Sequence, residues 1–154
     1  MPPGPSDLPM VDTARLARIL ARIRQDLATL GAYAEADRAD LGADDARLGH
    51  VKYAFVTMLE GCIDAAQHVC ASEGYGPPDT NADAMHSLAR NGVLPDGLAT
   101  AMASAVRFRN VLVHLYADVD DDVDDDRVLS YLDVLGDIGR FVAALAGLLD
   151  EERA

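Results

Sequence analysis

The sequence predicts an all-α fold, an antiparallel bundle of four long helices and one short helix. Apolar residues recur at steps of three and four along most of the chain, which is the spacing of one helix face. Half of the residues are hydrophobic but only 5% are aromatic, and this composition favours helices packed on helices. No alternating apolar–polar run is long enough to predict a strand. At 154 residues the chain is expected to form one domain with a substantial core.

The N-terminal end is expected to precede this domain. Residues 1–10 hold four of the seven prolines and show no apolar periodicity, so they are interpreted as a disordered lead-in, and the domain as residues 11–152. The first five residues lack the basic and apolar regions of a signal peptide. No apolar run approaches the ~18 residues that a membrane span requires. The sequence therefore predicts a cytoplasmic protein with no membrane association.

The first helix is expected to begin after Asp12, whose carboxylate suits an N-cap. Its core-facing stripe is formed by Leu16, Ile19, Leu20, Ile23, Leu27 and Leu30. Four basic residues fall mostly off this stripe and are interpreted as solvated surface: Arg15, Arg18, Arg22 and Arg24.

A second helix is expected from the Asp44–Asp45 pair to about Ser72. Its stripe is formed by Leu48, Val51, Phe55, Leu59, Cys62, Ala66 and Val69. Cys62 and Cys70 are eight residues apart, about 12 Å along the helix, too far for a disulfide, and both are expected in the core. Glu60, Asp64 and His68 share one side at a spacing of four, where Asp64 and His68 could orient a site residue. We favour a surface ion pair between them.

Glycine and proline then divide the chain into a short and a long helix. A loop at residues 74–78 precedes the short helix, which Thr80 or Asn81 can cap and which should stop at Asn91–Gly92. The fourth helix follows with Pro95 near its first turn.

Seven of the nine residues from Asp118 to Asp126 are aspartates, more than half of the net charge of −13. They lack the Gly and Glu spacing of a calcium-binding EF-hand loop, so a solvated lead-in to the last helix is the favoured interpretation. Asp124 to Asp126 suit the N-terminus of that helix. Its stripe is formed by Val128, Leu132, Leu135, Ile138, Val142, Leu145 and Leu149.

The acidic charge also argues against a protein that coats DNA phosphates with basic residues. Phosphate-loop, dinucleotide-binding and zinc motifs are absent, so we expect no metal and no cofactor.

The densest cluster of functional side chains lies at residues 107–116, RFRNVLVHLY. At about 100° per residue, one face of this helix is apolar and is formed by Phe108, Val111, Leu112 and Leu115. The other face is polar and is formed by Arg107, Arg109, Asn110, His114 and Tyr116. Met102, Val106 and Val113 form a thin apolar seam on that polar face. The pattern indicates a helix with one side in the core and one side available for chemistry.

Arg109 and His114 are the residue types that a metal-free ribonuclease needs. Histidine exchanges protons near neutral pH, and a positioned guanidinium stabilises charge on a phosphate. Five residues apart, the two diverge by roughly 140° on an ideal helix. Either local unwinding near Tyr116 or a two-fold dimer through the apolar seam would bring such groups to one phosphate. The residues equally allow a structural alternative, in which Arg109 pairs with an acid such as Glu60 and His114 caps the helix.

These residues carry a resemblance. Arg109, His114 and Tyr116 match the R-x4-H-x-Y signature of HepT, the HEPN-fold ribonuclease toxins of HepT/MntA toxin–antitoxin pairs. Residues 61–68 (GCIDAAQH) resemble the second helix of that family, and residues 91–95 (NGVLP) its middle loop. The similarity covers roughly residues 12–150, with an acidic run slightly longer than the usual connection.

The resemblance implies a dimeric HEPN fold that cleaves RNA, with tRNA as one candidate, without a metal. Arg109 and His114 would be the catalytic pair and Asn110 a supporting polar residue. It also implies an MntA-like nucleotidyltransferase partner that transfers AMP to Tyr116. An i to i+7 step returns to nearly the same face, so AMP on Tyr116 would add bulk and negative charge beside Arg109.

Two alternatives stay open. The chain could be a non-catalytic module that binds a nucleotide or a nucleotidyltransferase, with Arg109 and Tyr116 contacting the ligand and a structural His114. It could also be a helical scaffold with an incidental motif.

Overall fold

The computed structural model describes residues 12–117 and 125–153, and of residues 114–117 and 151–153 it describes the backbone only. Its elements in order are α1 Thr13–Ala34, α2 Arg38–Gly42, α3 Asp45–Ser72, α4 Asn81–Arg90, α5 Asp96–Ala117, α6 Asp125–Ser130, the 3₁₀ turn η3 Tyr131–Val134, and α7 Leu135–Arg153. No strand occurs within the described residues.

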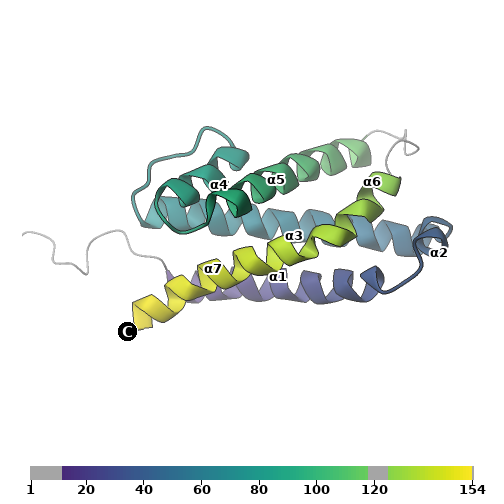
Figure 1. Cartoon of the computed structure of the whole chain (residues 1–154), viewed down its shortest axis with the longest axis horizontal. Coiled ribbons are helices and arrows are strands. Elements are labelled where there is room, and N and C mark those ends of the chain that lie inside the picture. The colour runs from purple at the N-terminus through teal and green to yellow at the C-terminus, as the bar shows by residue number, and fades with distance from the viewer. Residues whose placement is uncertain (1–11, 118–124, 154) are drawn as a thin grey trace, which may run out of the picture.

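Four long helices lie side by side and alternate in direction (Figure 1). Helices α1 and α5 run one way along the bundle, and α3 and α7 run the other way. The short helix α4 packs beside α5 at one end, while α2 lies at the opposite end. The predicted all-α antiparallel bundle is therefore confirmed.

Polar caps set the helix ends much as the sequence predicts. The Asp12 carboxylate accepts a hydrogen bond from the Arg15 backbone N–H, and Asp44 caps α3 in the same way through Arg47. The Thr80 hydroxyl caps α4, and Gly92, just beyond its end, has a φ of +78°, a conformation that glycine adopts without strain.

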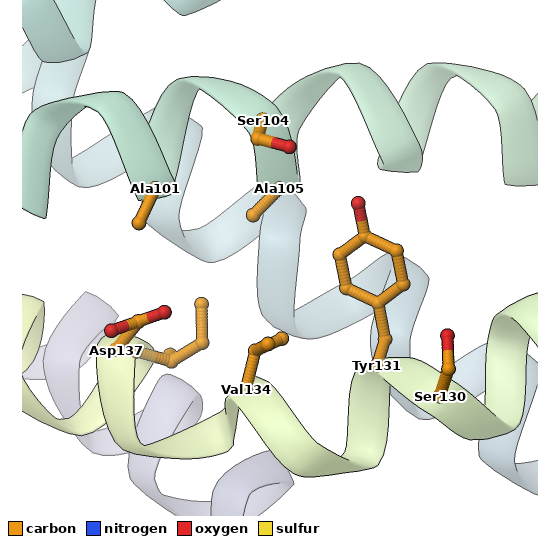
Figure 2. Close-up of a pocket in the computed structure, with 8 residues that line it drawn as sticks. Ala101, Ser104, Ala105, Ser130, Tyr131, Val134 and Asp137 are labelled. Atoms are coloured by element: carbon orange, nitrogen blue, oxygen red, sulfur yellow. The ribbon is translucent and has the colours of Figure 1, made fainter.

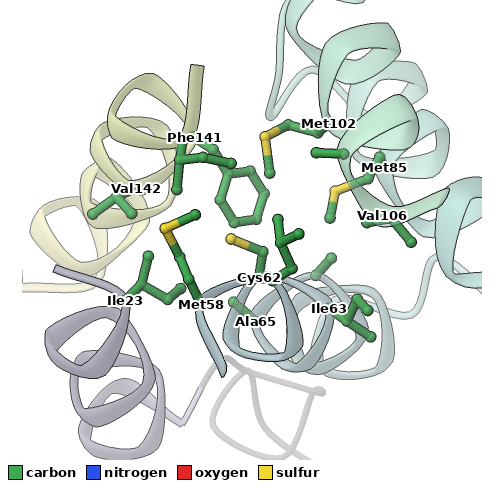
Figure 3. Packing of buried hydrophobic residues seen from close by; sticks show 14 of the residues in the cluster. Ile23, Met58, Cys62, Ile63, Ala65, Met85, Met102, Val106, Phe141 and Val142 are labelled. Atoms are coloured by element: carbon green, nitrogen blue, oxygen red, sulfur yellow. The ribbon is translucent and has the colours of Figure 1, made fainter. Parts of the chain in front are cut away.

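Helix α3 lies at the centre of the bundle and is buried on more than one side. Figure 3 shows its Met58 and Cys62 in one buried cluster with residues from every other long helix: Ile23 of α1, Met102 and Val106 of α5, and Phe141 and Val142 of α7. The predicted stripe of α3 is buried throughout, and Ala54, Met58, Ile63, Ala65 and Cys70 are buried in addition.

The apolar seam on α5 was misassigned by helix geometry alone. Met102 and Val106 are 0% exposed and belong to the core, whereas Val113 is 37% exposed. Helix α5 packs against α3, α4 and α7, so its first half is covered on several sides and has no free apolar face.

Two predictions about local structure need correction. The predicted last helix is divided into α6, η3 and α7. The five-residue α2, which Asp37 caps, was not predicted from the sequence. The predicted Asp64–His68 pair does not form. Asp64 instead pairs with Arg22 of α1 at 3.3 Å, and the His68 ring nitrogen Nε2 accepts the backbone N–H of Asp12 at 3.1 Å. Partners on a neighbouring helix have replaced the partner on the same helix.

Other surface and core assignments are confirmed. Arg15, Arg18, Arg22 and Arg24 are exposed. Both cysteines are free and buried, and burial raises the pKa of the Cys62 thiol far above its usual value. A buried thiol that resists ionisation is a packing residue and not a nucleophile. Residues 118–124 of the predicted acidic run, and the lead-in at residues 1–10, lie outside the described residues.

Candidate functional site at the end of helix α5

Aromatic packing fixes the second half of α5 against the bundle. The Phe108 ring stacks on Tyr131 of η3, with centroids 3.7 Å apart, and meets Phe55 of α3 edge-on at 5.8 Å. The Arg127 guanidinium lies 5.7 Å from the centre of the Phe108 ring. Such pairs add about 0.5–1.5 kcal/mol each beyond burial, so the backbone next to Phe108 is well anchored. Arg109 is the next residue along this anchored helix.

The Arg109 guanidinium is held by two side chains. Its Nη2 donates to the Glu60 carboxylate of α3 at 3.0 Å, and its Nη1 donates to the Asn110 side-chain oxygen at 3.2 Å. Its Nε is buried and donates to no described residue. An arginine has five N–H donors in a rigid fork, so these two bonds set its orientation and leave donors for an anion.

Glu60 has two effects on this cation. As a partner, Glu60 holds the guanidinium through an ion pair at 3.0 Å. The pair is partly covered, with the Arg109 side chain 25% exposed and the Glu60 side chain 43% exposed. As an acid, it offsets part of the positive charge that a phosphate would meet. The Arg109–Glu60 pair of the structural alternative is therefore present.

The structure brings Arg109, Asn110 and Glu60 together, but it does not place His114 on their side of the helix. Helix α5 continues without a break to Ala117, which excludes the local unwinding that could have joined the motif on one chain. The backbones of Arg109 and His114 therefore diverge by roughly 140° around the axis, and Tyr116 returns to within about 20° of Arg109. The side chains of His114 and Tyr116 lie outside the described residues.

A second ion pair closes the same end of the bundle. Lys52 of α3 and Asp125 of α6 are 2.9 Å apart, so the described end of the acidic run is tied to the helix that carries Glu60. This pair is not predictable from sequence spacing, because Lys52 and Asp125 are distant in the chain.

Tyr53 of α3, which is 60% exposed, is a further residue on the Glu60 face that was not predicted from the sequence. Its spacing of seven residues from Glu60 was the available signal.

A separate groove between α5 and the η3–α7 segment has a volume of about 190 Å³. In Figure 2 the Tyr131 hydroxyl points toward α5 and Asp137 lines the other end of the groove. The groove holds no basic side chain and none of the predicted site residues, so it is poorly suited to a phosphate.

Within the described residues, no group of three or more His, Cys, Asp or Glu side chains is arranged to hold a metal ion. In that same part of the chain, no helix combines the length and apolar character that a membrane crossing demands.

Comparisons with known proteins agree with this fold. The structure resembles a chain of the complex between a tri-AMPylated HEPN toxin and its MNT antitoxin from Shewanella oneidensis, with a TM-score of 0.76, 22% identity, and 90% of this chain and 99% of that chain covered. It resembles a chain of a toxin–antitoxin complex with AMP-PNP at a TM-score of 0.74 and 23% identity, covering 88% of this chain and 99% of that one. It also resembles YutE, a cytosolic Bacillus subtilis protein of unknown function, at a TM-score of 0.79 and 14% identity, covering 94% and 95%.

Sequence comparison adds a relative and a family. The chain is 31% identical over 64 residues to the mRNA nuclease HepT of Shewanella oneidensis, and the match spans 42% of this chain and about half, 48%, of that relative. Residues 19–136 match the family described as ribonuclease HepT-like. The chain is a HEPN-fold member of the ribonuclease HepT-like family.

Proposed function

We propose that the chain is a metal-independent endoribonuclease toxin, neutralised when an MntA-like nucleotidyltransferase antitoxin transfers AMP to Tyr116. The observation that carries the proposal is the Arg109 guanidinium, oriented by Glu60 and Asn110 on an anchored helix that also bears His114 and Tyr116. Family membership and the mRNA nuclease named above support the ribonuclease class.

In the proposed reaction the 2′-hydroxyl of RNA attacks the adjacent phosphorus and the 5′-oxygen leaves. A base removes the 2′-hydroxyl proton, an acid protonates the 5′-oxygen, and the products carry a 2′,3′-cyclic phosphate and a 5′-hydroxyl. His114 serves as acid or base, and Arg109 stabilises the charge that develops on the phosphorane. Asn110 supports the guanidinium.

A two-fold dimer completes this arrangement. On one unbroken helix Arg109 and His114 face different directions, so the two groups meet at a single phosphate only when a second motif helix lies alongside. In such a homodimer one His114 acts as the base and the other as the acid.

Modification of Tyr116 is the proposed control. The tyrosine oxygen attacks the α-phosphorus of ATP, pyrophosphate leaves, and the phenolic proton is released. The AMP then places a negative charge on the face of α5 that carries Arg109 and competes with RNA phosphate for the guanidinium. A nucleotidyltransferase is the class of partner that this reaction needs. The proposed modification is in line with the resemblance of the fold to an AMPylated toxin.

The test is RNA cleavage in EDTA by protein whose mass shows an unmodified Tyr116. Wild type should generate 2′,3′-cyclic phosphate ends, while Arg109→Ala and His114→Ala should lose activity by roughly a hundredfold or more, the usual scale for an acid–base or electrostatic group. Equal cleavage by all three proteins would assign the activity to another site or to a contaminant.

Glu60→Gln tests the orientation of Arg109. The amide keeps a hydrogen-bond acceptor but loses the charge, so cleavage should change in rate while the fold is retained. Asp64→Asn is the matched control, because Asp64 lies one turn along α3 and pairs with Arg22, away from the motif.

A non-catalytic nucleotide-binding module remains the alternative, favoured by the partial neutralisation of Arg109 by Glu60. It predicts ATP or AMP binding that Arg109→Ala abolishes, with no RNA cleavage by unmodified wild type.

A further inference from the structure

One exposed aromatic side chain shares a face of α3 with Glu60, the partner of Arg109, and has no role in the packing described above. Among the described residues, the large hydrophobic side chains that are exposed are Tyr53 at 60%, Val113 at 37% and Val134 at 37%. A lone exposed apolar residue needs no explanation, but an exposed aromatic ring on the face that borders a candidate phosphate site is a common ligand contact.

Helix geometry places Tyr53 on the side of α3 that carries Glu60. The two residues are seven apart in an unbroken helix, so they differ by about 20° around the axis and about 10 Å along it. Glu60 reaches across to Arg109, and therefore Tyr53 belongs to the α3 face that borders the motif end of α5.

Two cross-helix contacts give the level of Tyr53 along α5. Phe55 meets Phe108, and Glu60 meets Arg109, while α3 and α5 run in opposite directions (Figure 1). On α3, Tyr53 precedes both Phe55 and Glu60. Because the helices are antiparallel, Tyr53 lies level with residues 110–116, toward the C-terminal end of α5. Val113, the exposed apolar residue of the motif, lies within this stretch.

The Tyr53 side chain is also free of the contacts that fix the other rings. Phe55, Phe108 and Tyr131 form the aromatic cluster, and Tyr33 bonds His50. Within the described part of the chain, Tyr53 takes part in neither arrangement and its hydroxyl bonds to no residue. The exposed ring of Tyr53 is therefore available for contact with a ligand.

We propose that Tyr53 is a stacking platform for a base of single-stranded RNA, next to the phosphate that Arg109 holds. The inference rests on the proposed ribonuclease function and deepens it. A tyrosine ring offers a flat apolar face at low entropic cost and accepts every base, since every base has a π-face. The site therefore takes unpaired RNA, with little preference for one base at that position, and discriminates against a duplex whose bases are already stacked.

Four variants separate stacking from simple apolar contact. Tyr53→Phe and Tyr53→Trp keep a ring and should cleave an unstructured RNA with a KM close to that of wild type. Tyr53→Leu and Tyr53→Ala remove the ring, and KM should rise by roughly tenfold while kcat changes little, as expected for the loss of one base–aromatic stack. Val134→Ala, which truncates an exposed side chain outside this face, is the control and should leave both constants unchanged.

A second readout does not depend on cleavage. A short single-stranded RNA containing 2-aminopurine is titrated with protein that carries His114→Ala, with Tyr53 intact or changed to Leu. Stacking should quench the fluorescence with Tyr53 present, and replacement by Leu should remove most of that quenching.

The two readouts fail separately. Cleavage by wild type with an unchanged KM in Tyr53→Leu overturns the platform and leaves the ribonuclease standing. Quenching that depends on Tyr53, without any cleavage by wild type, supports the platform and overturns the ribonuclease. A change in the solution mass of Tyr53→Leu, measured by light scattering, assigns Tyr53 to contact with a second copy and overturns the platform.

Discussion

Helix α5 is buried on several sides along its first half and on one side along its second half. Ala99, Met102, Ala103 and Val106 are at most 1% exposed, between α3, α4 and α7. Beyond them Phe108 and Leu112 stay buried, but Val113 is 37% exposed and Asn110 is exposed. Helix α4 has 10 residues against 22 in α5, and Figure 1 shows it beside the first half only. The length of a neighbouring helix thus decides where α5 changes from core to candidate site.

The largest expected effect tests the anchor between these halves. Phe108→Ala should lower the free energy of unfolding by about 3–5 kcal/mol, since it removes a fully buried ring and its contacts with Phe55 and Tyr131. Urea denaturation followed by circular dichroism measures the loss. A loss below about 1 kcal/mol would mean that the aromatic cluster does not hold α5 in place.

A pair of truncations compares the two halves directly. Met102→Ala should cost about 2–5 kcal/mol, whereas Val113→Ala should stay within about 0.5 kcal/mol of wild type. The same denaturation experiment measures both. Comparable losses would remove the distinction between a covered and an open half.

A glycine next to Glu60 tests how tightly the far side of α3 is packed. A Cβ on Gly61 would lie 2.8 Å from Cγ1 of the fully buried Ile23, so Gly61→Ala should cost about 1 kcal/mol despite the better helix propensity of alanine. Gly31→Ala in α1 is the control, because a Cβ there meets nothing within 4 Å, and it should stabilise by up to about 1 kcal/mol. Stabilisation by both changes would show that α1 and α3 tolerate a wider separation.

The smallest effect concerns the opposite end of the bundle, where histidine is structural. Burial, and then the nearby Arg15 cation, lower the pKa of His68 below its usual value of 6.5. The unfolded chain therefore binds more protons just below pH 6.5, so the stability from this group is present above that pH and is lost as the pH falls through the lowered pKa. Between pH 7 and pH 5, wild type should therefore lose more stability than His68→Gln in parallel urea titrations. An equal loss in both proteins would assign the acid sensitivity to other groups.

Local signals in the sequence determined the helices. Asp12, Asp44 and Thr80 cap the elements that the sequence predicts they cap, because a cap depends on residues one turn away. The stripe of α3 was also readable, since apolar spacing follows from the geometry of one helix. The composition of the motif identified the end of α5 as the candidate site, and its resemblance to the HepT family is confirmed.

Tertiary structure decided which of these surfaces remain exposed and which polar side chains pair with each other. The sequence offered Asp64 as a partner for His68 and Met102 and Val106 as an exposed seam, and packing against α1 and α4 overruled both. It named Glu60 only as one acid that Arg109 could meet, and the fold selects it and places Tyr53 on the same face. Periodicity describes one helix at a time, whereas burial and ion pairing depend on neighbours distant in the chain, whose lengths and positions only the folded bundle fixes.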